Sequence, residues 1–175
     1  MLPAAGPYYL SLIDALLTAS DRSRFAGRCK GSHGSALKTM VVQNLFRILL
    51  VAVGSACGGV LRWIVGAGVG QWLGTAWPWG TFLINISGSM FLGWFLTRLD
   101  LRSNGAGGLS ADQLRLLIGV GFTGGYTTFS SFEWESLGLL GKNQALAAAA
   151  YIIGSAALGL LGVYLGAALA RPATP

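Results

Sequence analysis

The chain has 175 residues, of which 53% are hydrophobic and only 10% are charged. Soluble domains carry roughly 25% charged residues, so this composition excludes a soluble globular protein and indicates an integral membrane protein. The net charge of +6 does not indicate nucleic-acid binding, because no basic patch with interleaved aromatic residues accompanies it. The two cysteines and one histidine lack metal-ligand spacing, so neither a structural disulfide nor a Cys/His metal site is expected.

Residues 1–40 differ in composition from the rest of the chain. They contain Gly, Ser, Pro and scattered basic residues, and their apolar piece, 8–19, is too short to span a membrane. That piece also contains Asp14 and makes a poor signal peptide. We interpret residues 1–40 as a disordered extension or as a misassigned start, with Met40 as the true first residue. A mobile cytoplasmic tail is the alternative interpretation.

Four membrane-spanning helices can be placed after Met40. Two uncharged runs, 64–97 and 143–170, exceed the roughly 20 predominantly apolar residues that a bilayer requires. Together they form one transmembrane domain over residues 41–171. The predicted helices cover 45–67, 79–96, 114–140 and 144–170. An even number of crossings puts both termini on one side, which from residue 40 onward carries five arginines against two basic residues on the other. The positive-inside rule therefore predicts cytoplasmic termini.

The third predicted helix contains the stretch GFTGGYTTFSSFEWE, residues 121–135. Glycine costs about 1 kcal/mol against alanine in a helix interior, so clustered Gly with interleaved Thr favours a break in this helix. The carbonyls at the end of a broken half-helix can bind cations, and such backbone survives in a membrane where protein or a wet cavity surrounds it. Close helix packing through small residues is the alternative.

Aromatic and polar side chains follow the glycines. Phe129 and Phe132 are three residues apart and share a helical face. Because an aromatic ring has a positive edge, this pair can hold a small anion without a fixed charge, although contact with the core or lipid is the ordinary interpretation. Ser130, Ser131 and Glu135 add polarity nearby.

Polar residues on the other helices are further candidates. Asn85, in the middle of the second helix, indicates either a donor to an anion or an interhelical hydrogen bond. Tyr151 and Ser155 are spaced i, i+4 and form a small polar stripe on the fourth helix. Arg62 is either a snorkelling anchor or a charge that concentrates anions in a vestibule.

Three motifs occur in order, GGVLRW (58–63), GTFLINISGSMFLG (80–93) and GFTGGYTTFSSF (121–132). With them, the chain from about 45 to 170 resembles the CrcB/Fluc family of fluoride channels. The resemblance implies an all-α membrane protein with a broken third helix that forms an antiparallel, dual-topology dimer with two pores. It implies passive export of fluoride across the cell (inner) membrane, which prevents fluoride toxicity. The implied partners are fluoride, the lipid bilayer, and a second copy or an oppositely oriented homologue.

The resemblance also implies a role for each candidate residue. Main-chain carbonyls of Gly124 and Thr127 would hold a structural sodium ion (Na+) at the dimer centre. The implied fluoride pore consists of Asn85, Phe129, Phe132, Tyr151 and Ser155. The implied vestibule or polar track consists of Arg62, Ser130, Ser131 and Glu135. The sequence departs from the family pattern at Glu133, an acid that should repel fluoride unless it is protonated, paired or turned away.

Other functional classes fit the sequence less well. A small multidrug exporter needs a membrane-buried acid in its first helix, and 45–67 contains none. A non-conducting scaffold would explain the glycines but not Asn85 together with the Phe pair. An enzyme is the least expected class, because the only histidine lies in the tail and no Ser/His/Asp or Cys/His set is available. The arginine asymmetry leaves a homodimer and a pair with an oppositely oriented homologue both open.

Overall fold

The computed structural model describes residues 33–101 and 109–172. Most of the predicted extension 1–40 therefore lies outside the described residues, as does 102–108, between the predicted helices 79–96 and 114–140. The chain divides into two compact units, Met1–Val42 and Gln43–Pro175, and the description below concerns the second. All regular structure within the described ranges is helical, which confirms the all-α fold class.

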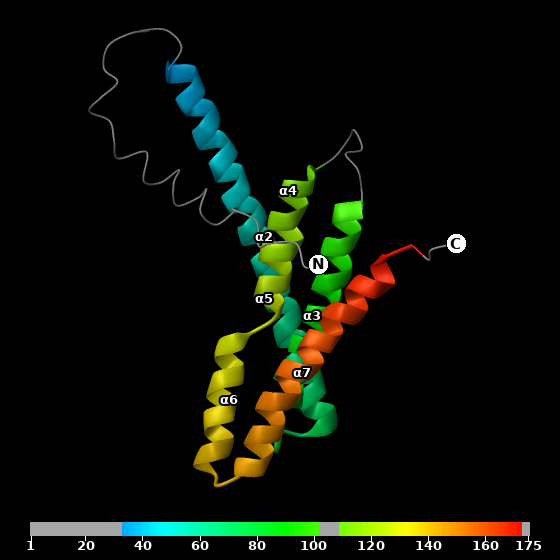
Figure 1. Ribbon diagram of the computed structural model, residues 1–175. Coiled ribbons are helices and arrows are strands. Elements are labelled where there is room, and N and C mark those ends of the chain that lie inside the picture. The colour runs from blue at the N-terminus through cyan, green and yellow to red at the C-terminus, as the bar shows by residue number, and fades with distance from the viewer. Residues whose placement is uncertain (1–32, 102–108, 173–175) are drawn as a thin grey trace, which may run out of the picture. The chain divides into compact units, whose positions relative to one another are not determined.

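Three long helices dominate the structure (Figure 1): α2 (His33–Leu73), α3 (Trp79–Leu101) and α7 (Ala145–Ala170). Within the described residues, three segments are long and apolar enough to cross a membrane: Lys38–Leu73, Trp79–Leu101 and Ala145–Ala170. Helix α2 extends beyond the predicted 45–67 because nothing breaks it before Gly74, whose φ of 76° is the left-handed conformation that ends many helices.

The predicted third helix, 114–140, is interrupted. The chain forms α4 (Ala111–Leu114), the π-helix η1 (Arg115–Thr123) and the short α5 (Gly124–Tyr126). Two extended residues follow, and then α6 (Phe129–Gly141) begins. The turns of η1 are wider than those of an α-helix. The Thr123 hydroxyl fits this geometry, because it donates to the carbonyl of Ile118, five residues earlier, at 3.0 Å. No piece of this segment is long enough by itself to span a bilayer.

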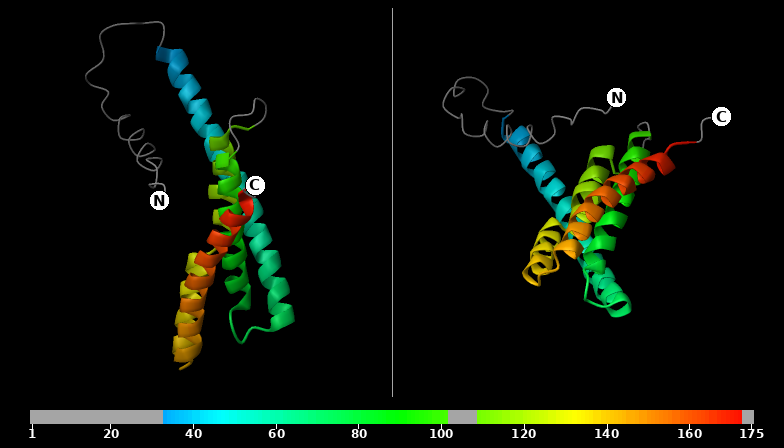
Figure 2. Two further views of the ribbon diagram at one scale, coloured as in Figure 1. Left: turned by 45° about the vertical axis from the view of Figure 1, so that its right-hand side comes forward. Right: turned by 60° about the horizontal axis from the view of Figure 1, so that its bottom comes forward.

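Local sequence explains where these helical pieces begin and end. Ser110 and Gln113 form a capping box at α4: Ser110 Oγ accepts the Gln113 N–H at 3.3 Å, and Gln113 Oε1 accepts the Ser110 N–H at 2.8 Å. The turn between α6 and α7 contains Asn143 with φ 59°, a conformation that asparagine tolerates better than most residues. This tight turn places α6 beside the first half of α7 (Figure 2).

Helices α3 and α7 cross closely through glycines. A Cβ atom at Gly93 would collide with the carbonyl oxygen of Val163, and one at Gly166 would collide with the carbonyl oxygen of Met90. The two backbones therefore meet without intervening side chains, which is the packing that small residues allow in membranes. The close crossing holds the α3 face that carries Asn85 in a fixed position.

Helix α2 packs against the broken segment in the same way. A Cβ atom at Gly54 would collide with the Leu117 carbonyl oxygen, and one at Gly58 would collide with that of Phe122. Gly54 and Gly58 are four residues apart, so both lie on one face of α2. This face sets the distance between α2 and the helix break.

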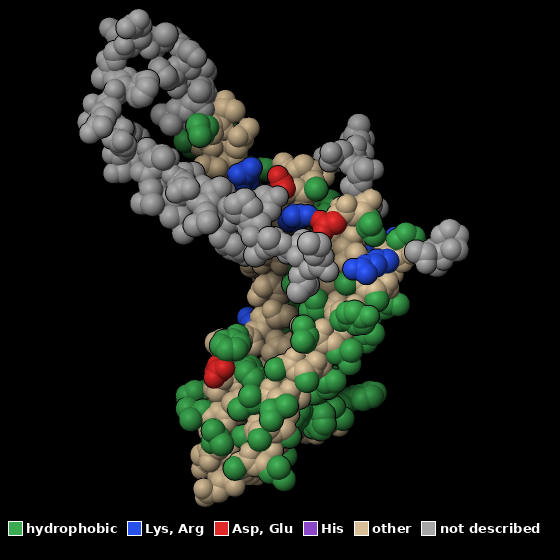
Figure 3. Space-filling model, in the orientation of Figure 1, with side chains coloured by type: hydrophobic (Ala, Val, Ile, Leu, Met, Phe, Trp, Pro, Cys, Tyr) green, Lys and Arg blue, Asp and Glu red, His purple; other side chains and the backbone are tan. Residues whose placement is uncertain are grey.

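Hydrophobic side chains cover much of the surface. Figure 3 shows them over α6 and α7, with few charged side chains among them. The exposed fraction is 75% for Trp134, 85% for Leu146 and 73% for Leu160. An apolar surface of this kind is stable only against lipid or another protein chain.

Candidate functional site

The helix break lies at Thr127 and Thr128. Thr127 has φ −77° and ψ 157°, and Thr128 has φ −147° and ψ 118°, so both residues are extended. Thr128 then caps α6, because its Oγ1 accepts the N–H of Ser131 at 3.2 Å. β-branched threonine suits extended backbone, and the glycines before it weaken the helix. The Gly/Thr cluster thus produces the break that its composition predicts.

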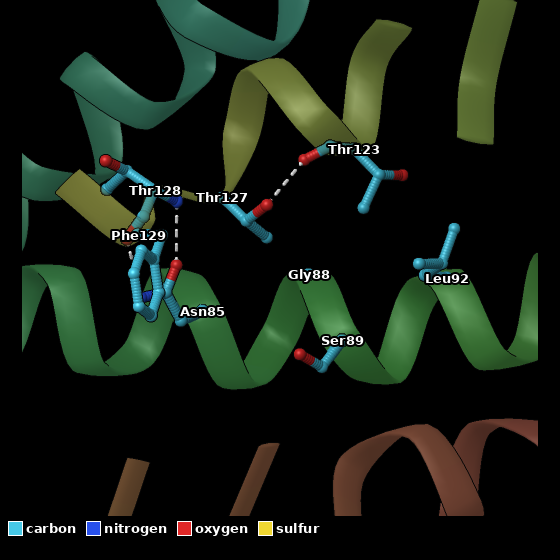
Figure 4. Close-up of a pocket in the computed structure, with 8 residues that line it drawn as sticks. All are labelled: Asn85, Gly88, Ser89, Leu92, Thr123, Thr127, Thr128 and Phe129. Atoms are coloured by element: carbon cyan, nitrogen blue, oxygen red, sulfur yellow. Dashed lines mark hydrogen bonds between the residues drawn. The ribbon is translucent and has the colours of Figure 1, made fainter. Parts of the chain in front are cut away.

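The side chain of Asn85 on α3 bridges this break. Its Nδ2 donates to the Thr128 carbonyl oxygen at 3.0 Å, and its Oδ1 accepts the Thr128 N–H at 2.8 Å (Figure 4). The amide therefore satisfies both backbone groups of a residue that has left the helix. An asparagine amide has two donor hydrogens, and the described residues use only one of them. The interhelical hydrogen bond and a free donor coexist in this residue.

The carbonyls at the end of α5 are the second feature of the break. Thr127 directs both its N–H and its Oγ1 hydroxyl to the Thr123 carbonyl, each at 2.9 Å. Because the Thr128 N–H goes to Asn85, the Gly124 carbonyl loses the partner that a continuous helix would supply. The Thr127 carbonyl accepts a long hydrogen bond of 3.4 Å from Arg62 Nη1. The end of this half-helix is therefore a centre of partial negative charge.

A groove of about 210 Å³ lies beside the break. Figure 4 shows Phe129 and Asn85 at one end of the groove and Leu92 at the other. Its lining residues come from α3 and the broken segment: Asn85, Gly88, Ser89, Leu92, Thr123, Thr127, Thr128 and Phe129. The groove is mostly apolar with a few hydroxyl and amide groups, which suits a weakly held solute better than a tightly bound one.

Glu135 on α6 is fixed by two hydroxyl groups from other helices. Thr81 Oγ1 donates to its Oε1 at 2.8 Å, and the Tyr151 hydroxyl donates to its Oε2 at 2.7 Å. Tyr151 has no exposed surface in the structure. Glu135 also lines a cavity of about 590 Å³, together with Arg62 and Ser131. One acid and one base thus border the same cavity.

Aromatic rings connect the groove to this acid. The ring centroids of Phe129 and Phe132 are 5.7 Å apart, and those of Phe132 and Tyr151 are 5.1 Å apart. Phe129 is 75% exposed, whereas Phe132 is half-buried against the cluster that contains Leu139 and Tyr151. The rings form a continuous row from the break to the Tyr151 hydroxyl.

The predicted site residues fall into two neighbouring groups. Asn85, Thr127 and Phe129 meet at the groove. Arg62, Ser131 and Glu135 border the cavity, and Tyr151 and Phe132 join the groups through their ring contacts. The other three predicted residues differ in their surroundings. Gly124 is exposed beside the break, and the exposed Ser130 has its Oγ 3.4 Å from the Thr128 Oγ1. The Ser155 Oγ is buried with no hydrogen-bond partner among the described residues.

Thr81 is a site residue that the sequence interpretation missed. It lies four residues before Asn85, so both side chains share one face of α3, and this spacing was the available signal. A second missed contact joins the Ser87 and Tyr126 hydroxyls at 3.0 Å and ties α3 to α5. Glu133, the unexplained acid, is exposed on α6, and the described part of the chain gives it no ion pair.

Comparison with known proteins gives one family. The profile described as CrcB-like protein, Camphor Resistance (CrcB), matches residues 49–167. The fluoride-specific ion channel FluC of Rhizobium meliloti is 41% identical over 124 residues, which are 71% of this chain and 95% of that protein. FluC of Chloroflexus aurantiacus is 40% identical over 124 residues, covering 71% and 94%. FluC of Rhizobium etli is 38% identical over 127 residues, covering 73% and 98%.

Proposed function

The chain belongs to the CrcB family, and because its curated relatives are fluoride-specific ion channels, we propose that it conducts fluoride passively across a membrane. It is a multi-pass membrane protein and a channel rather than an enzyme. The structural observation that carries the proposal is the helix break at Thr127 and Thr128, which Asn85 bridges and the Phe pair follows.

The site supplies many modest interactions and no strong one. Fluoride must exchange its water shell for protein groups, and conduction requires sites that the ion can both enter and leave. The second N–H of Asn85 and the positive ring edges of Phe129 and Phe132 would attract the fluoride ion weakly, one after another along its path. Ser130, Ser131 and Ser155 add hydroxyl donors, and Tyr151 links the row of rings to Glu135. No ATP or proton coupling is needed.

We propose that the channel is an antiparallel dimer with four crossings per chain. The pieces α4, η1, α5 and α6 would together make the third crossing. The support is the exposure of Phe129, whose side chain is 75% exposed in the single chain. A ring that lines a pore must be enclosed by protein, so the surface opposite Phe129 would come from a second subunit. The second subunit is an inverted copy or an oppositely oriented homologue.

We also propose that the Gly124 and Thr127 carbonyls hold a structural sodium ion at the dimer centre. The two carbonyls fit a monovalent cation, because they lie at the negative end of a half-helix and Gly124 lacks its helical partner. Two carbonyls from each subunit would surround the ion. An ion held there would offset the partial negative charge of these carbonyls.

The proposed physiological direction is outward across the cell (inner) membrane. Neutral HF enters and dissociates inside, and the membrane potential, worth about 2.3 kcal/mol per charge per 100 mV, then drives the anion out. Export of this kind lowers cytoplasmic fluoride and prevents its toxicity.

Fluoride efflux from liposomes that contain the purified protein tests the function. We expect rapid fluoride loss at a fluoride electrode and no chloride loss. Phe132→Ile should reduce the fluoride rate about tenfold, because a ring edge worth about 1.4 kcal/mol is lost. Phe46→Ile is the matched control, since Phe46 is exposed on α2 and lines neither the groove nor the cavity. Folded protein that releases no fluoride, or releases chloride equally well, would contradict the proposed function.

Thr81 provides a second prediction. Thr81→Val keeps the side-chain shape but removes the hydroxyl that donates to Glu135 at 2.8 Å. Leaving a buried acceptor without its donor costs about 1–3 kcal/mol, so we expect fluoride efflux to fall at least severalfold. Thr97→Val on the same helix is the control. Equal rates for the two variants would show that the bond to Glu135 has no part in conduction.

A further inference from the structure

Arg62 makes a contact with the backbone of the helix break. Its predicted role as a charge that concentrates anions in a vestibule does not explain this contact. Its Nη1 donates to the carbonyl oxygen of Thr127, the extended residue that directly follows α5, at 3.4 Å. The two residues are 65 positions apart in the sequence. A guanidinium is always charged, so the chain places its own cation at the negative end of the broken half-helix. The same carbonyl belongs to the proposed sodium site.

The geometry of this contact shows that it is weak enough to be displaced. Protein N–H···O hydrogen bonds are most often 2.9–3.0 Å long, so 3.4 Å is a loose bond. Arg62 is half-buried, and its side chain also lines the 590 Å³ cavity that contains Glu135. The guanidinium therefore borders open space and shares that cavity with an acid.

We propose that Arg62 is a resident cation that competes with the bound monovalent cation for the Thr127 carbonyl and thereby sets the affinity of that site. The inference rests on the proposed sodium site. Two positive charges cannot share one carbonyl in a half-buried setting without mutual repulsion, so binding of the ion moves the guanidinium toward the cavity. Arg62 is thus a positioning residue whose charge tunes cation binding.

The test measures cation affinity separately from conduction. Thermal unfolding of the detergent-solubilised full chain is followed as NaCl replaces N-methyl-glucamine chloride at constant ionic strength. Sodium binding should raise the unfolding temperature. We expect Arg62→Gln to reach half of this rise at about a tenfold lower sodium concentration than the native chain, because the competing charge is gone. Arg62→Lys keeps the charge and should stay within about twofold. Arg98→Gln, at the exposed end of α3, is the control for net charge.

Four outcomes would overturn the inference. They are an unchanged midpoint in Arg62→Gln, a higher midpoint in Arg62→Gln, an equal decrease in Arg98→Gln, and a native chain that does not respond to sodium. If Arg62→Gln fails to fold, Arg62→Lys decides, and a tenfold change in its midpoint also overturns the inference. Fluoride efflux from the native chain separates the two proposals: rapid native efflux together with any overturning result leaves the channel function standing.

Discussion

Gly58→Ala is expected to destabilise the folded protein by about 2–3 kcal/mol and to abolish fluoride efflux. A Cβ atom at this position would collide with the Phe122 carbonyl oxygen and lie 2.8 Å from the Tyr126 nitrogen. Both atoms belong to backbone, so α2 and the broken segment must move apart, at the cost typical of overpacked interiors. Tyr126 directly precedes the break, so the displacement reaches Thr127 and Thr128.

Gly68→Ala is the matched control, because it lies on the same helix and a Cβ there meets nothing within 4 Å. Both substitutions gain the same helix propensity, about 1 kcal/mol, so their difference isolates the collision. Thermal unfolding and the fraction of protein eluting as one species measure stability, and liposome efflux measures function. Similar stability and efflux in the two variants would show that the contact between α2 and the broken segment is not required.

The sequence was sufficient to predict the break but not what holds it. Clustered Gly and Thr weaken a helix because their helix propensities are low, and this property can be read directly from residues 121–128. The partner of Thr128 is Asn85, 43 residues away, and only the packing of α3 against the broken segment brings them together. Asn85 was predictable as a site residue because a mid-membrane amide needs a hydrogen-bond partner, but the identity of that partner depends on the fold.

The ends of the helices illustrate the same limit. Hydropathy locates the apolar middle of α2 but not its ends, because helix termination depends on Gly74 and on residues outside the apolar run. The π-helical geometry of η1 has no compositional signal at all. The pairs Gly54/Gly58 and Gly162/Gly166 are visible as small-xxx-small spacing, yet the spacing does not say which helix approaches them.

Asn85→Asp is expected to reduce fluoride efflux about 100-fold while the protein still folds. Aspartate is nearly the same shape, and its Oδ1 can still accept the Thr128 N–H, which Asn85 accepts at 2.8 Å. The donor to the Thr128 carbonyl is lost, and the carboxylate adds a negative charge beside Phe129 at the groove. Repulsion between two anions a few ångströms apart at a half-buried site is worth about 3 kcal/mol, which corresponds to the expected loss in rate.

Asn143→Asp provides the control, because Asn143 has the same chemistry but lies in the turn between α6 and α7. Efflux should be near native in this variant, and thermal unfolding should show that both proteins fold. A defect that comes from the lost donor alone would appear equally in Asn85→Ser, which has no charge. We expect Asn85→Ser to conduct faster than Asn85→Asp, because only the aspartate repels the ion. Native-like efflux in Asn85→Asp would place the fluoride path away from the break and would remove Asn85 from the pore.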